Sequence, residues 1–199
     1  MTTGLSPATF ERLQLNAGVF LANFDHSGIT DVDALKDAIA DAIMDVEVCL
    51  GATRGGGSFQ CTPEMRGVEA DGKRSEFVGS MVNDGWTVKL TTTLLEATAA
   101  NFKRAFISAD VETKGNVTTI TPRTAIKDED YIKSLCWVGD TSKGYVLIEL
   151  DNALNLTGAN FTFTDKGEGT LPVEFQAHQS DLLQQDNAPC RVIFINEEV

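Results

Sequence analysis

Short runs typical of β-strands fill most of the chain after residue 116, and in two of them, residues 158–164 and 171–178, apolar and polar side chains alternate. An alternation with a period of two puts the apolar side chains on one face of a β-strand. The runs predict strands over residues 116–121, 131–138, 145–150, 158–164, 171–178 and 190–195. The segment 165–169 carries Gly167 and Gly169 and predicts a hairpin turn between two of these strands. So many short strands indicate a domain that is mostly β after residue 116.

The last of these runs differs from the others, because residues 192–195 are apolar at every position. A strand that is apolar on both faces is either central and covered on both sides, or presents one face to another subunit. Both placements are open at this point.

Two segments have the apolar spacing of helices. After a predicted strand near residues 19–24 and a turn at 25–28, we expect Thr30 to cap an N-terminal helix over residues 31–44. Apolar residues recur there at three- and four-residue spacing and form one face that extends just beyond the helix: Val32, Leu35, Ile39, Ile43 and Val46.

The second helix is predicted over residues 94–107. Thr93 and Glu96 have the spacing of a capping box, in which a hydroxyl and a carboxylate satisfy backbone N–H groups at the helix start. The apolar stripe of this helix comprises Leu95, Ala99, Phe102 and Phe106. With strands in the majority, the predicted fold class is α+β, mostly β, in a single domain over 1–199 whose first part, 1–48, holds the N-terminal strand and helix.

We expect residues 49–66 to form a flexible loop within that domain, because three consecutive glycines stand at positions 55–57. The stretch 54–58 lacks the lysine and the strand-to-helix context of a phosphate-binding loop, so that a mobile connection is the preferred interpretation.

The chain after this loop predicts a hairpin. Asp71 and Gly72 stand between two extended runs, residues 60–70 and 73–79, and an Asp-Gly pair favours a tight turn. A half-buried strand follows, whose apolar side carries Trp86, Val88 and Leu90.

The charge balance limits the partners of this protein. The chain has 29 acidic and 16 basic residues, which gives a net charge of −13. Such a surface repels nucleic acid rather than gripping it, and the same excess also serves solubility. The apolar fraction of 42% is enough for a packed core and excludes disorder as the overall state.

The sequence predicts a protein that is made and kept in a cytoplasm. No apolar run reaches the roughly 18 residues that a membrane-spanning helix needs, and the first residues lack the basic and apolar regions of a secretory signal. The four cysteines are far apart in the sequence and are expected to be free, mostly buried thiols: Cys49, Cys61, Cys136 and Cys190.

No arrangement of residues indicates catalysis. His26 and His178 are the two histidines, and each is better explained as a turn or surface residue than as a general base. The chain carries none of the nucleotide-binding, serine-hydrolase or zinc-protease motifs. The adjacent acidic residues 128–130 favour a solvated loop over a cation site, because ligands must converge. We therefore expect no enzyme activity, no cofactor and no metal.

Four stretches, taken in order, carry a family resemblance. They are a hairpin tip at 67–72, a strand at 84–90, a helical stretch at 94–105 and a late strand at 169–178. In this order they resemble the major tail tube protein family of bacteriophages, over about three quarters of the chain.

The resemblance implies a β-sandwich or barrel-like domain with a packed helix, whose copies form hexameric rings that stack into a tube. Phage DNA would pass through this tube without specific binding. The implied partners are further copies of the chain, the tape measure protein and tail terminator or baseplate proteins. The implied location is the virion tail, after assembly in the bacterial cytoplasm. A loop that orders on docking to a neighbour would then comprise Arg54, Gly55, Gly56, Gly57 and Ser58.

Two other functions remain open. The chain could be a ring former of a contractile injection or secretion machine, whose channel passes protein, or a β-sandwich binding module. For a channel that DNA traverses, we expect a net negative inner wall, because each contact of Lys or Arg with a phosphate adds affinity. The candidate lumen-facing residues lie on or beside predicted strands and are Glu149, Asp151 and Glu174.

Overall fold

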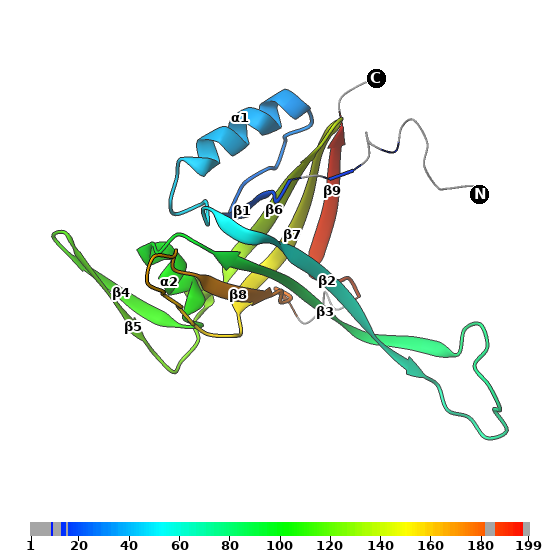
Figure 1. The fold of residues 1–199 in the computed structure, drawn as a ribbon. Helices are drawn as coiled ribbons and strands as arrows, with labels where there is room; N and C mark the ends of the chain where they lie inside the picture. The colour runs from blue at the N-terminus through cyan, green and yellow to red at the C-terminus, as the bar shows by residue number, and fades with distance from the viewer. Residues whose placement is uncertain (1–8, 10–12, 15, 182–185, 197–199) are drawn as a thin grey trace.

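A computed structural model describes residues 9, 13–14, 16–181 and 186–196 (Figure 1). The described residues form nine β-strands and two α-helices, so the mostly β, α+β fold predicted from the sequence is confirmed. The strands are β1 (Val19–Ala22), β2 (Thr53–Gly67), β3 (Met81–Leu94), β4 (Ala109–Lys114), β5 (Val117–Pro122), β6 (Ile132–Thr141), β7 (Gly144–Asn155), β8 (Leu171–Gln176) and β9 (Cys190–Asn196). The helices are α1 (Val32–Ile43) and α2 (Ala99–Ala105), and a 3-10 turn, η2, spans Asp128–Asp130.

Strand β7 connects the two layers of the fold. It pairs with β6 and, from Gly144 to Leu150, with β9; at Leu154 and Asn155 it pairs with β8. Asn152 lies between these two pairings with a φ of 45°, a left-handed conformation that asparagine tolerates. In the described part of the chain the strand order is therefore β1-β6-β7-β8-β3-β2, with β9 on β7. Figure 1 shows β2 and β3 crossing β6, β7 and β9.

The main core lies between the two layers. Both layers contribute buried apolar side chains, among them Phe20, Leu90, Leu135, Leu150 and Phe175. Burial of each such side chain stabilises the fold by about 1.5–3 kcal/mol. A second cluster covers the opposite face of the layer formed by β1, β6, β7 and β9, where α1 packs against it. This layer is therefore covered on both faces along much of its length.

Helix α1 packs through Leu35 and Ile39, as its apolar spacing predicts, and also through Ala42. The predicted cap is wrong by one residue. The carboxylate of Asp31, and not the hydroxyl of Thr30, accepts a hydrogen bond of 2.8 Å from the N–H of Ala34. The apolar face is also shorter than expected, because the helix ends at Ile43 and both Ile43 and Val46 are exposed.

Helix α2 begins later than predicted. Strand β3 continues through Leu94, which pairs with Leu171 of β8, so Thr93 cannot cap a helix. Thr98 is the N-cap instead, and its side chain accepts from the N–H of Asn101 at 3.1 Å. The carboxylate of Glu96, expected in a capping box, accepts from the N–H of Ala52 at 2.8 Å. Strand pairing has overridden the local helix signal here.

The shift of α2 also changes its buried face. Ala100, Asn101 and Ala105 are buried, while Phe102 and Phe106, two members of the predicted stripe, are half-buried. The side-chain amide of Asn101 donates to the carbonyl of Leu50 at 2.9 Å, so this polar group is satisfied within the fold.

The prediction of a flexible loop over residues 49–66 is wrong. Residues from Thr53 onward form β2, which pairs with β3 from Thr53 to Gly67. The glycines are accommodated at a bulge, where the register shifts between Thr53 and Gly57 and the two glycines between them have φ values of 74° and 70°. A Cβ on Gly57 would lie 2.4 Å from the carbonyl oxygen of Thr91, so this position needs glycine for close approach of the backbones.

Two further strand predictions need correction. Asp71 and Gly72 lie in a turn, but β3 begins only at Met81, and residues 68–80 form one long connection in which 73–79 is not a strand. In the expected strand 158–164, only Thr162 pairs, through reciprocal hydrogen bonds with Thr170 of 2.9 and 2.8 Å. The other predicted strands after residue 116 correspond to β5, β6, β7, β8 and β9, with shifted ends.

We predict that Leu35→Ala destabilises the protein by about 2–5 kcal/mol, because it leaves a cavity between α1 and the sheet. The matched control is Ile43→Ala in the same helix, whose side chain is exposed and should change the free energy of unfolding by less than about 1 kcal/mol. Urea denaturation of both variants measures this. Equal losses would show that α1 is not anchored through Leu35.

Candidate functional site

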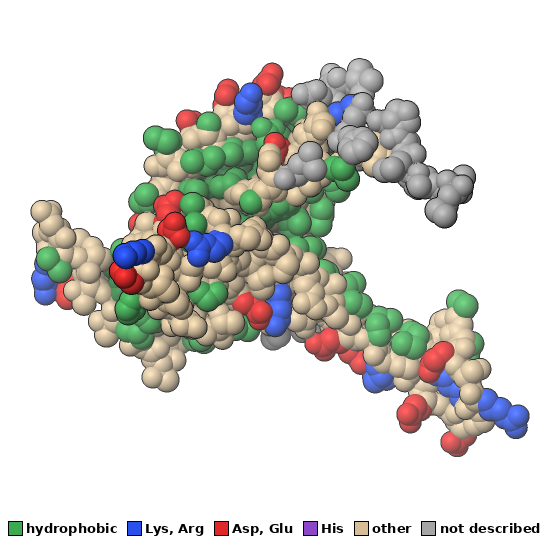
Figure 2. Space-filling view, viewed as in Figure 1, with side chains coloured by type: hydrophobic (Ala, Val, Ile, Leu, Met, Phe, Trp, Pro, Cys, Tyr) green, Lys and Arg blue, Asp and Glu red, His purple; other side chains and the backbone are tan. Residues whose placement is uncertain are grey.

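A long hairpin projects from the sandwich, and we call residues 62–87 the arm. It consists of β2 after Cys61, a tip at 68–80 and β3 before Val88. Val88 is buried, whereas residues 62–66 on the opposite strand are all exposed. Figures 1 and 2 show the arm extending away from the body of the molecule.

Hydrogen bonds hold the tip of the arm in one conformation. The N–H of Val68 donates to the carbonyl of Ser80 at 2.8 Å. The ammonium of Lys73 donates to the carbonyl of Val68 and to the carboxylate of Glu76, each at 2.7 Å. The hydrogen bond from Lys73, together with one from Ser80, holds the pKa of Glu76 below its ordinary value. The tip is thus ordered without an apolar core of its own.

An ion pair joins the two strands of the arm. The guanidinium of Arg66 donates two hydrogen bonds, of 2.7 and 3.0 Å, to the carboxylate of Asp84. These bonds lower the pKa of Asp84. An exposed ion pair of this kind adds little to the free energy of unfolding. Its two parallel hydrogen bonds nevertheless restrain the relative position of the two strands of the hairpin.

Apolar side chains of the arm face solvent. Phe77 at the tip is 66% exposed, and the neighbouring Val78 is fully exposed. Further exposed apolar residues lie on the two strands and at the start of the tip: Met65, Val68, Met81, Val82 and Trp86. Figure 2 shows apolar side chains on the arm, next to acidic and basic ones. Apolar groups gathered on a projecting element are typical of a surface that meets a partner.

Strand β9 provides a second candidate surface. It pairs only with β7 among the described residues, so it is an edge strand and not the central strand that its composition allowed. Ile193 and Ile195 pack in the cluster beneath α1. On the other face, Val192 is 49% and Phe194 is 66% exposed. The central placement is therefore wrong, and the alternative, in which one face of this strand meets another subunit, stays a prediction.

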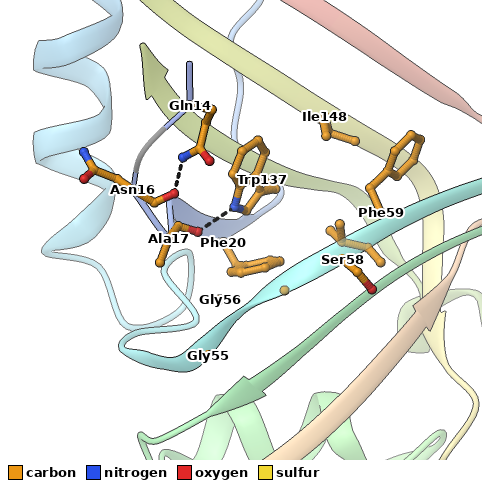
Figure 3. Close-up of a pocket in the computed structure, with 12 residues that line it drawn as sticks. Gln14, Asn16, Ala17, Phe20, Gly55, Gly56, Ser58, Phe59, Trp137 and Ile148 are labelled. Atoms are coloured by element: carbon orange, nitrogen blue, oxygen red, sulfur yellow. Dashed lines mark hydrogen bonds between the residues drawn. The ribbon is translucent and has the colours of Figure 1, made fainter. Parts of the chain in front are cut away.

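A cavity of about 450 Å³ opens where β2 passes the layer of β6 and β7. Its apolar lining includes Phe20, Phe59, Trp137 and Ile148, and Figure 3 shows these side chains around it. The indole N–H of Trp137 donates to the carbonyl of Ala17 at 2.9 Å, which fixes one wall.

The candidate docking residues 54–58 lie within β2 and not in a free loop, and four of them lie at this cavity. Gly55, Gly56, Gly57 and Ser58 line it. Arg54 forms an ion pair with Glu168, and the hydroxyl of Ser58 shares a hydrogen bond of 2.6 Å with that of Thr91. These residues belong to the folded body, at the end of β2 opposite the arm.

Glu149 and Asp151, two candidate lumen-facing residues, share Arg191 of β9. The guanidinium of Arg191 donates to Glu149 at 3.0 Å and to Asp151 at 2.9 Å. Glu149 also accepts from the hydroxyl of Ser134 at 2.7 Å, and the Nε2 atom of His26 lies 3.2 Å from it. Only 5% of Glu149 is exposed, so its carboxylate lies inside the fold.

The two carboxyls respond differently to burial. Burial acts to raise the pKa of Glu149, but hydrogen bonds from Ser134 and Arg191 outweigh it and hold the pKa below its ordinary value. For Asp151 burial prevails and raises the pKa, although Arg191 opposes this.

Glu174 is also paired. The ammonium of Lys89 on β3 donates to its carboxylate at 2.7 Å. All three candidate lumen-facing carboxylates are therefore neutralised, at least in part, by a cation beside them. Figure 2 shows acidic side chains over α1. The exposed acidic residues on α1 and around its two ends are Asp31, Asp33, Asp37, Asp41, Asp45 and Glu47.

The remaining polar residues singled out by the sequence have structural contacts. The ring of His178 stacks edge-on against Tyr131, with ring centroids 5.4 Å apart, and its Nδ1 lies 3.1 Å from the carbonyl oxygen of Asn152. Asp130, expected in a solvated acidic loop, instead accepts from the guanidinium of Arg123 at 2.7 Å, with only 2% of its side chain exposed.

The chain matches no known protein family and no curated protein sequence. Among the residues that the structure describes, no helix is both long and apolar enough to cross a membrane. In the same residues, histidines, cysteines and carboxylates do not form any group of three or more that could hold a metal ion. Within the described part of the chain, the arm, the edge strand β9 and the cavity are candidate surfaces for a partner.

Sequence reasoning did not single out the arm and placed the candidate docking element in the glycine-rich segment instead. A signal was present in two apolar pairs, Phe77-Val78 and Met81-Val82, within the polar surroundings of the Asp71-Gly72 turn. Apolar pairs beside a turn have no core to enter when the hairpin projects from the domain.

We predict that Glu149→Gln destabilises the protein at pH 7 by about 1–3 kcal/mol, because it removes the charge from a buried, hydrogen-bonded carboxylate. The folded-state pKa of Glu149 lies below its unfolded value. The ionised form therefore adds stability above the unfolded pKa, and this is lost as the pH falls through the folded pKa.

Stability measured from pH 7 down to about pH 3 should consequently fall less steeply in Glu149→Gln than in the unmodified protein. Glu112→Gln, at an exposed residue of β4, is the control and should leave the pH profile unchanged. Identical profiles for all three proteins would contradict the assignment of this network.

Proposed function

We propose that this chain is a structural subunit of a phage or prophage tail tube, which self-assembles into stacked hexameric rings that form the channel for DNA. The observation that carries the proposal is the arm. A hairpin held by its own hydrogen bonds presents Phe77 and Val78 to solvent, away from the core of its own subunit. This combination favours a protein whose work is to contact another subunit.

The reach of the arm supports contact with a neighbouring copy. Strand β2 continues for residues 62–67 beyond the body, which corresponds to about 20 Å at the usual rise of a β-strand, and the tip extends it further. Apolar side chains at the end of such an element can be buried only by another molecule.

The open sheet edges support the same proposal. Strands β9 and β2 each pair on one side only among the described residues. An unpaired edge with exposed apolar side chains, such as Val192 and Phe194, invites a strand or a surface of another chain. Closure into a ring satisfies such edges without forming an open-ended aggregate.

The charge distribution fits a channel that does not hold DNA. The net charge is −13, and basic side chains contribute to ion pairs within the subunit, as Lys89, Arg123 and Arg191 do. Lysines and arginines occupied in this way are poorly placed to retain phosphates. The order of the four stretches that resemble the tail tube family supports the proposal independently.

We predict that the double variant Phe77→Ser, Val78→Ser folds normally and fails to assemble. Both side chains are exposed, so thermal unfolding should be close to that of the unmodified protein. Sedimentation over a wide concentration range, combined with negative-stain electron microscopy, should show rings or tubes for the unmodified protein at high concentration and only small species for the variant.

The matched control is Val117→Ser on the β4–β5 hairpin, another exposed apolar residue on a projecting element, which should assemble normally. A strict monomer at every concentration, also with other tail components added, would refute the proposal. Normal tubes from the double variant would show that the arm is not the contact surface.

A further inference from the structure

Two of the four cysteines meet where the arm leaves the body. The thiol of Cys190 donates a hydrogen bond to the sulfur of Cys61, with the two Sγ atoms 3.9 Å apart. Cys61 is the last residue of β2 before the exposed arm, and Cys190 is the first residue of β9. Both pack against the main core from opposite layers of the sandwich, although 129 residues separate them in the sequence.

We propose that Cys61 and Cys190 form a dithiol site that closes to an intramolecular disulfide, which fastens the root of the arm to the edge strand β9. The S–S bond of a disulfide is about 2.05 Å long. The two sulfur atoms are now 3.9 Å apart, so closure requires them to approach each other by roughly 2 Å. Side-chain rotation and a small shift at the start of β9 would provide this movement.

The other two cysteines cannot form such a bond in this fold. Leu21 of β1 pairs with Cys136 on one side and with Cys49 on the other. Residues two strands apart have Cα atoms about 9.5 Å from each other, beyond the roughly 7 Å that a disulfide can bridge. Both thiols are also buried, in the cluster beneath α1. Cys49 and Cys136 therefore serve as internal controls.

The oxidant for this site is a small-molecule disulfide such as oxidised glutathione. One cysteine thiolate attacks a sulfur of oxidised glutathione, forms a mixed disulfide and releases one glutathione thiolate. The second cysteine thiolate then attacks the protein-bound sulfur of that mixed disulfide and expels the second glutathione. The two cysteines lose two electrons and two protons in total, and the oxidant takes them up as two thiols.

The bond would close a loop that contains most of the chain and would link two layers that otherwise meet through side-chain packing at this point. Reducing conditions in a cytoplasm keep such a site open, and an oxidising environment closes it. The arm could thus fold freely during synthesis and be fixed in direction later. This inference does not depend on the tail tube proposal, because it concerns the thiols of a single chain.

The test is oxidation of the purified full-length protein with oxidised glutathione, followed by counting of free thiols after unfolding. The count should fall from four to two per chain. Tryptic digestion without reduction should yield the peptides 55–66 and 167–191 joined to each other. The melting temperature should rise by roughly 5–10 °C and return to its starting value after reduction.

Cys61→Ser and Cys190→Ser should each abolish the joined peptides and the rise in melting temperature, whereas Cys49→Ser should retain both. Circular dichroism before oxidation establishes that each variant is folded. Four free thiols after oxidation of the folded protein, glutathione attached separately to Cys61 and Cys190, or a bond that joins two chains would each overturn the proposal.

Discussion

The antiparallel pairing of β7 with three other strands is the interaction on which the rest of the structure depends. Up to Leu150 it lies between β6 and β9, and beyond Asn152 it pairs with β8. The change of partner carries β8, β3 and β2 across the first layer and so encloses the core. The buried amide of Asn155 stabilises this junction, since it donates to the carbonyl of Ala105 at 2.7 Å and accepts from the N–H of Glu174 at 3.1 Å.

The direction of the arm follows from this arrangement. Because β3 is held by β8 as far as Lys89, and Cys61 of β2 still packs on the core, the hairpin leaves the body at a defined point. Beyond that point its order comes from main-chain pairing and polar contacts, and its apolar side chains remain in water. Stability is concentrated in the sandwich, while the arm retains unsatisfied apolar surface. We infer that the stable core and the exposed apolar side chains of the arm together suit the subunit for assembly.

Much of the fold could be predicted from the sequence where the pattern is local. Local runs typical of strands located β5 to β9, and the spacing of Leu35 and Ile39 identified the buried face of α1. Prediction failed where pairing between distant segments outweighs local preference. The glycines at 55–57 suggested a loop but lie within β2, and Thr93 suggested a helix cap but lies within β3. The candidate site was less predictable, because contacts such as Glu149 with Arg191 join residues that only the folded sheet brings together.

We propose that the arm is the element by which one subunit contacts another. A cryo-electron microscopy reconstruction of the assembled particle tests it most directly, since it shows the surroundings of every arm. We predict that Phe77 and Val78 are buried against a neighbouring subunit, in the same position for each copy. An assembled particle in which the arms extend into solvent, with all contacts made by other surfaces, would contradict the claim.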